Sequence, residues 1–181
     1  ADVPAYAFDI AKANALLDAA GYAKGENGTR FTLKLRPAPY FNETRQFGDY
    51  LRQALAEIGI DAELENADSA AHQKAVYTDH DFDLAVAPPV FRGDPAISTT
   101  ILVQSGIPAG VGFSNQGGYA NTELDAVIAK AAETIDTTAR TDLYRQFQKL
   151  VVADLPLINV AEWGFITVAR DSVLNVASNP R

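Results

Sequence analysis

The sequence predicts an α/β fold, a three-layer-like sandwich built on a mostly parallel or mixed sheet. Helical and strand patterns alternate along the first half of the chain. A long loop, two further helices and two further strands follow. Such alternation is typical of parallel sheets, whose strands are joined by crossover helices. The chain has 181 residues, of which 48% are hydrophobic, so it is long enough to form one domain with its own core.

The first predicted unit is a helix followed by a strand. Residues 9–21 carry apolar side chains at helical spacing, with Asp9 as a suitable N-cap and Gly21 where a helix often turns left-handed. In residues 31–36, apolar and polar side chains alternate, which is typical of a half-buried strand, and Pro37 ends the pattern.

The next two units repeat this order. Apolar residues at helical spacing between positions 47 and 58 predict a helix closed by Gly59, and residues 60–64 predict the second strand. A shorter helix is expected over residues 69–77. Residues 82–87 are almost continuously apolar after Asp83, and we expect them to form a central strand covered on both faces.

The second half opens with a long segment rich in proline and glycine, residues 88–118, with room for a short helix near 98–103. Loops of this length are usually functional. Thr122 is then expected to be the N-cap of a helix, with an acidic residue three positions later. The remaining predictions are a helix over residues 138–153 and strands over 155–160 and 165–169.

Composition excludes several functions. Fifteen basic residues against 23 acidic ones give a net charge of −8, which disfavours nucleic acids and anionic membrane surfaces as partners. No apolar run approaches the roughly 20 residues of a membrane-spanning helix, so we expect no direct membrane insertion. The chain has no cysteine, which removes disulfides and thiolate metal sites, and we expect no metal or cofactor. No signal peptide is expected within the chain.

The sequence offers little for nucleophilic catalysis. His72 and His80 are the only histidines; one lies in a polar helical stretch and the other in an acidic turn, so both are expected at the surface. There is no G-x-S-x-G motif of the kind that presents a nucleophilic serine. No catalytic residue is therefore assigned.

Three aspartates before the third strand resemble the opening of a calcium loop. Asp79, Asp81 and Asp83 have the required spacing, but Leu84 and Val90 stand where such a loop needs glycine and glutamate. We expect a solvated turn, in which Asp83 has a structural role.

Aromatic and polar side chains gather where predicted strands end, and ligands of open α/β sheets bind beyond the carboxyl ends of the strands. Arg92 could hold a ligand carboxylate in a two-pronged pair. For the aromatic residues, packing beneath the long loop is an equal alternative. The candidate ligand-binding residues are Phe91, Arg92, Asn115, Tyr119 and Trp163.

Several segments match a known set of motifs in the same order. Residues 6–22 resemble Y-D-x-x-K-A-x-x-L-L-x-x-A-G-Y, with Ala7 and Phe8 between Tyr6 and Asp9, and residues 51–60 match L-x-x-x-L-x-x-I-G-I. Residues 82–84 read F-D-L, and Gly93-Asp94-Pro95 ends in D-P. Residues 113–119 read F-S-N-x-x-G-Y. The chain thereby resembles extracellular solute-binding proteins of family 5, the peptide- and nickel-binding receptors of ABC importers.

The resemblance implies one lobe of a two-lobe fold like that of type II periplasmic binding proteins. The matched segments belong to the second large lobe, domain III, so the chain resembles an excised lobe. On this basis, residues 6–172 form the ligand-binding lobe, while residues 1–5 and 173–181 are stumps of the crossings between lobes.

The functional expectation follows from the same resemblance. The lobe would bind an oligopeptide or related small solute, held between two lobes, for delivery to the membrane permease of an ABC importer. The protein would be periplasmic or extracellular, the chain monomeric, and no enzyme. The alternative is a small α/β hydrolase or glycosidase domain, although no two acidic residues lie in motifs that call for a general acid and base.

The chain departs from the family pattern at one point that concerns the ligand. Peptide receptors carry an aspartate four residues before the proline of the D-P turn, where it pairs with the peptide amine; here that position is Phe91. Phe91 cannot offset the lost hydration of an ammonium group as a carboxylate does. Asp94 is expected to cap the short helix after Pro95.

Overall fold

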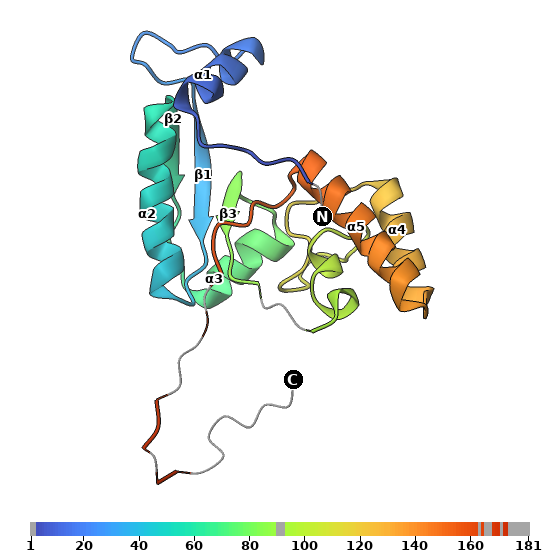
Figure 1. Cartoon of the computed structure of the whole chain (residues 1–181). Helices are drawn as coiled ribbons and strands as arrows, with labels where there is room; N and C mark the ends of the chain where they lie inside the picture. Colours follow the sequence, from blue (N-terminus) through green and yellow to red (C-terminus); the bar gives the residue numbers. More distant parts are fainter. Residues whose placement is uncertain (1–2, 90–92, 163, 165–167, 171, 174–181) are drawn as a thin grey trace.

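The computed structural model describes residues 3–89, 93–162, 164, 168–170 and 172–173 (Figure 1). As predicted, its sheet is parallel. The strands are β1 (Phe31–Pro37), β2 (Ile60–Leu64) and β3 (Leu84–Val86), in the order β2-β1-β3. β1 pairs with β2 along five residues and with β3 only near its carboxyl end.

One face of the sheet is covered by α2 (Asn42–Glu57), as Figure 1 shows. The helix approaches closely because Gly48 has no side chain: a Cβ atom there would lie 3.0 Å from Cγ of Pro37 and 3.3 Å from Cδ2 of Leu64. Leu35 and Ala62, in the strands, are buried. This side of the sheet is therefore the core of the α/β part.

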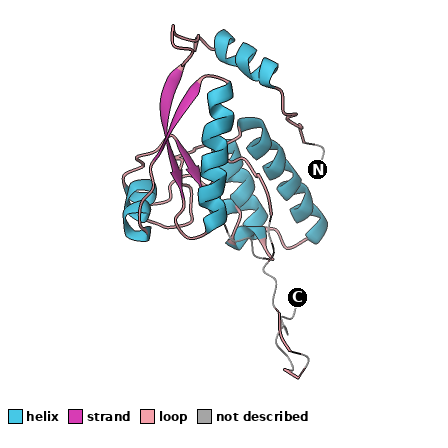
Figure 2. Ribbon diagram, turned by 90° about the vertical axis from the view of Figure 1, so that its left-hand side faces the viewer, coloured by secondary structure: helices cyan, strands magenta, loops and turns pink. Residues whose placement is uncertain are grey.

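The first helix, α1 (Ile10–Ala19), stands at the amino-terminal end of the sheet, set apart from the other helices (Figure 2). Its predicted N-cap is confirmed, because the Asp9 carboxylate accepts a hydrogen bond from the Lys12 backbone N–H. Gly21, with a φ of +90°, has the left-handed conformation expected after the helix. None of the residues of α1 is buried.

The helix predicted over residues 69–77 consists of two parts. α3 (Ser69–Gln73) begins after the Asp68 cap and continues directly into a π-helical turn, η1 (Lys74–Thr78). The wider turn buries Val76 and Tyr77. π-helical turns occur frequently at functional sites.

The second half forms a helical hairpin with a core of its own. The long loop contains two short 3₁₀ turns, η2 (Pro95–Ile97) and η3 (Thr100–Leu102), and leads into α4 (Thr122–Glu133) and α5 (Thr137–Asp154). The buried residues shared by η3 and the hairpin are Val103, Leu124, Ile128 and Phe147. None of the helices in the described ranges is long and apolar enough to cross a bilayer.

The N-cap of α4 differs from the prediction. Asn121, not Thr122, caps the helix: its side-chain oxygen accepts hydrogen bonds from the backbone N–H groups of Glu123 and Leu124. Both residues are good caps, so composition alone did not decide between neighbouring positions. Asn121 has the additional advantage that its amide donates to Asp154 on α5.

One strand prediction was wrong, one lies mostly outside the described residues, and one predicted strand has a different place in the sheet. Residues 155–160 form no strand; α5 ends at Leu155 in the left-handed conformation, with a φ of +51°, and the following segment finds no partner strand within the described residues. Of the strand predicted at 165–169, residues 165–167 lie outside the described residues. β3 is not central either: it is a half-buried edge of the described sheet, and β1 is the central strand.

Candidate functional site

Three connections meet at the carboxyl edge of the sheet, the lower end of the strands in Figure 1. Tyr40 follows β1, α3 and its π-helical turn follow β2, and the long loop follows β3. In open α/β sheets this edge is the usual place for a ligand.

Four rings lie together at this edge, and we refer to Tyr40, His72, Tyr77 and Phe113 as the ring cluster. The centroid of the Tyr40 ring lies 5.8 Å from that of His72, edge to face, and 6.0 Å from that of Phe113. The Phe113 ring also lies 6.2 Å from Tyr77. Rings at these separations attract one another, so residues from three connections form one contiguous surface.

Hydrogen bonds fix the ring cluster to the backbone around it. Gln73 donates from Nε2 to the Tyr40 hydroxyl over 2.8 Å. The Gly110 N–H donates to the Tyr77 carbonyl, and Gly112 lies so close to Gln73 that a Cβ atom would stand 3.2 Å from its Oε1. The long loop is thereby anchored on α3 and its π-helical turn.

His72 is buried, contrary to the expectation that it lies at the surface. Only 2% of the residue is exposed, and its Nδ1 has no hydrogen-bond partner among the described residues. Burial is the main reason that the pKa of His72 is lowered, and the charge of Arg36 lowers it further. The polar neighbours in the sequence hid this burial, because the ring packs against Tyr40 from a distant connection.

Of the three aspartates before β3, Asp79 and Asp81 pair with basic side chains and Asp83 bonds to backbone groups. Lys34 and Arg36 both contact the Asp81 carboxylate. The pairing with Lys34 is the main reason that the pKa of Asp81 is lowered, and the pairing with Arg36 lowers it further. Asp83 has the structural role expected of it, since its carboxylate accepts from the Lys34 N–H over 2.7 Å while its own N–H donates to the Lys34 carbonyl. Asp79 pairs with Lys74.

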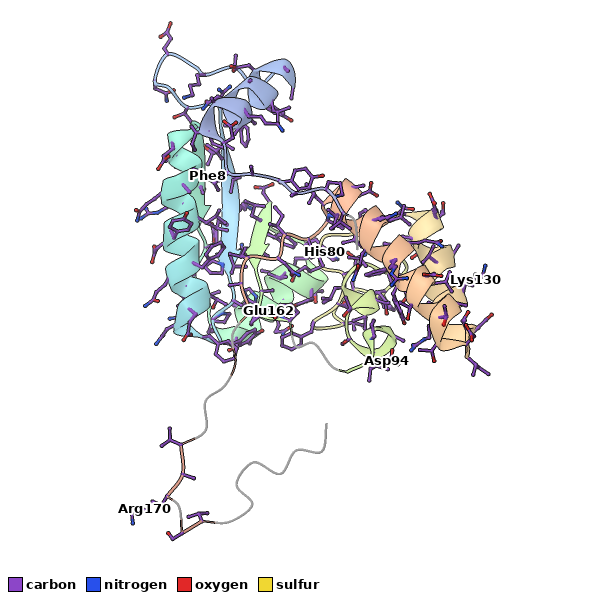
Figure 3. All side chains as sticks on the ribbon, in the orientation of Figure 1. Phe8, His80, Asp94, Lys130, Glu162 and Arg170 are labelled. Atoms are coloured by element: carbon purple, nitrogen blue, oxygen red, sulfur yellow. The ribbon has the colours of Figure 1, made fainter. Side chains whose placement is uncertain are left out.

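His80 stands at the surface, as expected, between the sheet and the helical hairpin (Figure 3). With Phe82, Asp83 and Gln116 it borders a shallow, open depression of about 230 Å³. Its Nδ1 lies 2.9 Å from the Gln116 carbonyl oxygen, so this nitrogen carries the proton when the ring is neutral.

Asn115 and Tyr119, two predicted ligand-binding residues, lie together in the long loop. The Asn115 amide donates to the carbonyl oxygens of Gln104, over 3.0 Å, and Tyr119, over 2.7 Å. The Tyr119 ring packs against the core of the hairpin, and its hydroxyl donates to Asp154. Burial is the main reason that the pKa of Tyr119 is raised, and the Asp154 carboxylate raises it further. Both side chains hold the loop in place.

Phe91, Arg92 and Trp163, the other three predicted residues, lie outside the described residues. Tyr40 was missed as a candidate, although it follows a strand at the same edge and the same reasoning could have found it. Phe113 stood out in the sequence only as one of several aromatic residues in the loop.

Asp94 caps η2, as expected, by accepting from the Ala96 N–H over 2.9 Å. The sequence did not indicate its second partner. Arg140 of α5 donates to both carboxylate oxygens, over 2.8 and 3.0 Å, and lies over the Tyr144 ring. The bond to Arg140 is the main reason that the pKa of Asp94 is lowered. The helical hairpin is thus tied to the turn that follows β3 (Figure 3).

Comparison with known proteins places the chain in a family. Residues 1–111 match the model of bacterial extracellular solute-binding proteins, family 5 Middle. Protein XP55 from Streptomyces lividans is 32% identical over 154 residues, which make up 81% of this chain and 27% of that protein. Di/tripeptide-binding protein 1 from Pseudomonas aeruginosa is 29% identical over 176 residues, or 96% of this chain and 32% of that protein.

The fold agrees with a solved structure. HbpA2 from Haemophilus parasuis superposes with a TM-score of 0.72 at 26% identity, over 86% of this chain and 30% of the other. This chain therefore spans about a third of the length of the proteins it resembles. The α/β architecture and the family resemblance predicted from the sequence are confirmed: the chain belongs to the bacterial extracellular solute-binding proteins of family 5.

Proposed function

We propose that the chain is one lobe of a two-lobe receptor that binds an oligopeptide or related small solute for an ABC importer. Family membership carries the proposal, because it rests on a match over residues 1–111 rather than on a single motif. The name of the Pseudomonas aeruginosa relative, a di/tripeptide-binding protein, supports peptides as the solute class.

In this proposal the ligand closes the receptor. A solute that contacts both lobes binds the closed state more tightly than the open one, and so shifts the population toward closure. The closed state is then recognised by the membrane permease. The receptor works outside the cytoplasm, in the periplasm or extracellular space, and catalyses no reaction. The chain alone is monomeric.

We propose that this lobe contributes five residues to the binding site, namely Phe91, Arg92, Asn115, Tyr119 and Trp163. Arg92 would pair with a carboxylate of the solute. Asn115 and Tyr119 would contribute by holding the long loop in shape, as their internal hydrogen bonds suggest. Phe91 in place of the amine-binding aspartate favours solutes that are not recognised through a free amine alone.

Calorimetric titration with trialanine tests the proposal. We expect the full-length protein that contains this chain to bind the peptide at least about 100-fold more tightly than the isolated chain, because one lobe buries only one side of the ligand. Micromolar binding by the chain alone would overturn the two-lobe account. A full-length protein that binds no peptide would overturn the solute class.

A further inference from the structure

We propose that Phe113 and Tyr40 form a recognition surface that receives an apolar or ring-bearing side chain of the solute. The inference rests on the proposed function and adds to it a preference among solutes. Neither residue is among the five ligand-binding residues proposed above.

The conformation of Phe113 is the first observation. Its φ of +57° lies in the left-handed region, which bulky residues rarely adopt, and its neighbours Gly112 and Ser114 do not share it. The ring is nevertheless 48% exposed, so burial of the side chain does not explain why phenylalanine stands there. Unfavourable backbone conformations of this kind cluster at ligand sites.

The support beneath the ring is the second observation. Tyr77 is 4% exposed; burial raises the pKa of its phenol, and the nearby Phe113 backbone acts in the opposite direction. The Tyr77 ring and that of Tyr40 lie against the Phe113 ring from two different connections. The loop is therefore held from below, and the exposed part of the Phe113 ring is presented in a fixed orientation.

The chemistry of the surface indicates what it would bind. The Tyr40 hydroxyl accepts from Gln73 and keeps its own O–H for a further partner, while Tyr77 is buried. What the exposed Phe113 offers to a ligand is ring surface. Such a surface gains most from an aliphatic or aromatic group, through burial of apolar area and ring stacking.

The position at the carboxyl edge of the sheet places this surface where open α/β sheets usually bind their ligands. Tyr40 lies three residues beyond the end of β1, and Phe113 belongs to the loop that follows β3. A solute held at this edge would meet both. Ile135, by contrast, is 96% exposed between α4 and α5, in the helical hairpin, and serves as a control.

The test compares two tripeptides, Ala-Phe-Ala and Ala-Ala-Ala, on the full-length protein by calorimetry. We expect the wild type to prefer Ala-Phe-Ala by about tenfold or more. Phe113→Gly should abolish most of that preference and leave the affinity for Ala-Ala-Ala within about twofold of wild type. Ile135→Ala should bind both peptides like the wild type.

Thermal unfolding distinguishes recognition from structure. Glycine adopts a φ of +57° without strain, which offsets part of the ring contacts that Phe113→Gly removes, so this variant should stay folded while its preference falls. If it melts earlier, Tyr40→Leu provides the second variant; it removes a ring at a position without a positive φ and should also lower the preference for Ala-Phe-Ala. Tyr40→Phe should retain the preference.

The remaining outcomes would overturn either this inference alone or the proposed function as well. A wild-type protein that binds both peptides equally, or variants that keep the full preference, would overturn this inference and leave the proposed function standing. A protein that binds neither peptide would overturn both.

Discussion

Two buried polar side chains at the carboxyl edge differ in whether they have hydrogen-bond partners. Arg36 is 8% exposed and reaches the Asp81 carbonyl and carboxylate, so its buried charge is compensated. His72, buried beside it, has an Nδ1 without a partner among the described residues. Burial favours the neutral form of the imidazole, and the positive charge of Arg36 adds to this effect, so the pKa of His72 is lowered.

The lowered pKa of His72 makes the stability of the fold depend on pH. As the pH falls below 6.5, the ordinary pKa of histidine, His72 binds a proton more readily in the unfolded chain than in the folded chain. This contribution is therefore complete above pH 6.5 and is lost as the pH falls below it. The charged group that acts on the ring is Arg36, which is itself paired with Asp81 and Glu65, and the Tyr40 ring lies against His72 edge to face.

We predict that His72→Phe reduces the loss of stability between pH 7 and pH 5, measured by urea unfolding at several pH values. Phenylalanine keeps the edge-to-face contact with Tyr40 and removes the group that protonates. His80→Gln, at the exposed second histidine, is the matched control and should keep the wild-type profile. A His72→Phe profile as steep as that of wild type would contradict the account.

At the scale of elements, one side chain makes the hydrogen bonds that join α1 to the sheet region within the described residues. None of the residues of α1 is fully buried, and these bonds come from Arg30, just before β1. The Arg30 side chain is 2% exposed and donates to Asn14 over 2.9 Å, to the Asp18 carboxylate and to the Ile58 carbonyl over 2.8 Å. One guanidinium thus joins the helix to the turn before β2.

Replacing Arg30 by alanine should therefore release α1 while the sheet stays folded. We expect amide hydrogen exchange within residues 10–19 to become at least about tenfold faster, because several charge-assisted hydrogen bonds are lost together. Exchange within β1 and α2 should change little. Arg145→Ala removes an exposed pair within α5 and is the control. Unchanged protection of α1 would mean that other contacts hold it.

The same scale shows how far the sequence predicts this fold. Periodicity located β1, β2, α2 and α5 well, because each element's apolar spacing matches the face that it buries. Periodicity gave a wrong prediction for residues 155–160. Their apolar side chains are typical of a strand, but no strand pairs with them within the described residues. A strand depends on its partner, and the pattern of one segment does not reveal whether the partner exists.

Prediction of the site depended on the same distinction. The carboxyl edge followed from the order of elements, and Asp94 as a cap followed from local sequence. The ring contacts in the ring cluster join residues more than 30 positions apart in the sequence. Arg140 and Asp94 are 46 positions apart. No local sequence pattern contains either set of contacts. The partner of the Tyr119 hydroxyl, Asp154, lies 35 positions away and could not be inferred for the same reason.

At the scale of the whole molecule, the described residues leave large apolar side chains uncovered. Phe8 is 82% exposed, Ile158 74% and Val168 90%. Apolar groups in such numbers are common at surfaces that contact another domain. The second lobe of the proposed receptor would be the natural partner for them, since the chain spans only 27% to 32% of its relatives.

The two-lobe receptor is the central claim, and native mass spectrometry of the full-length protein, purified gently from its source, tests it most directly. We predict a polypeptide roughly three times as heavy as this chain, in line with the share of each relative that the chain covers. It should carry additional mass from bound peptides or another small solute. A natural polypeptide no heavier than these 181 residues, without any bound solute, would contradict the account.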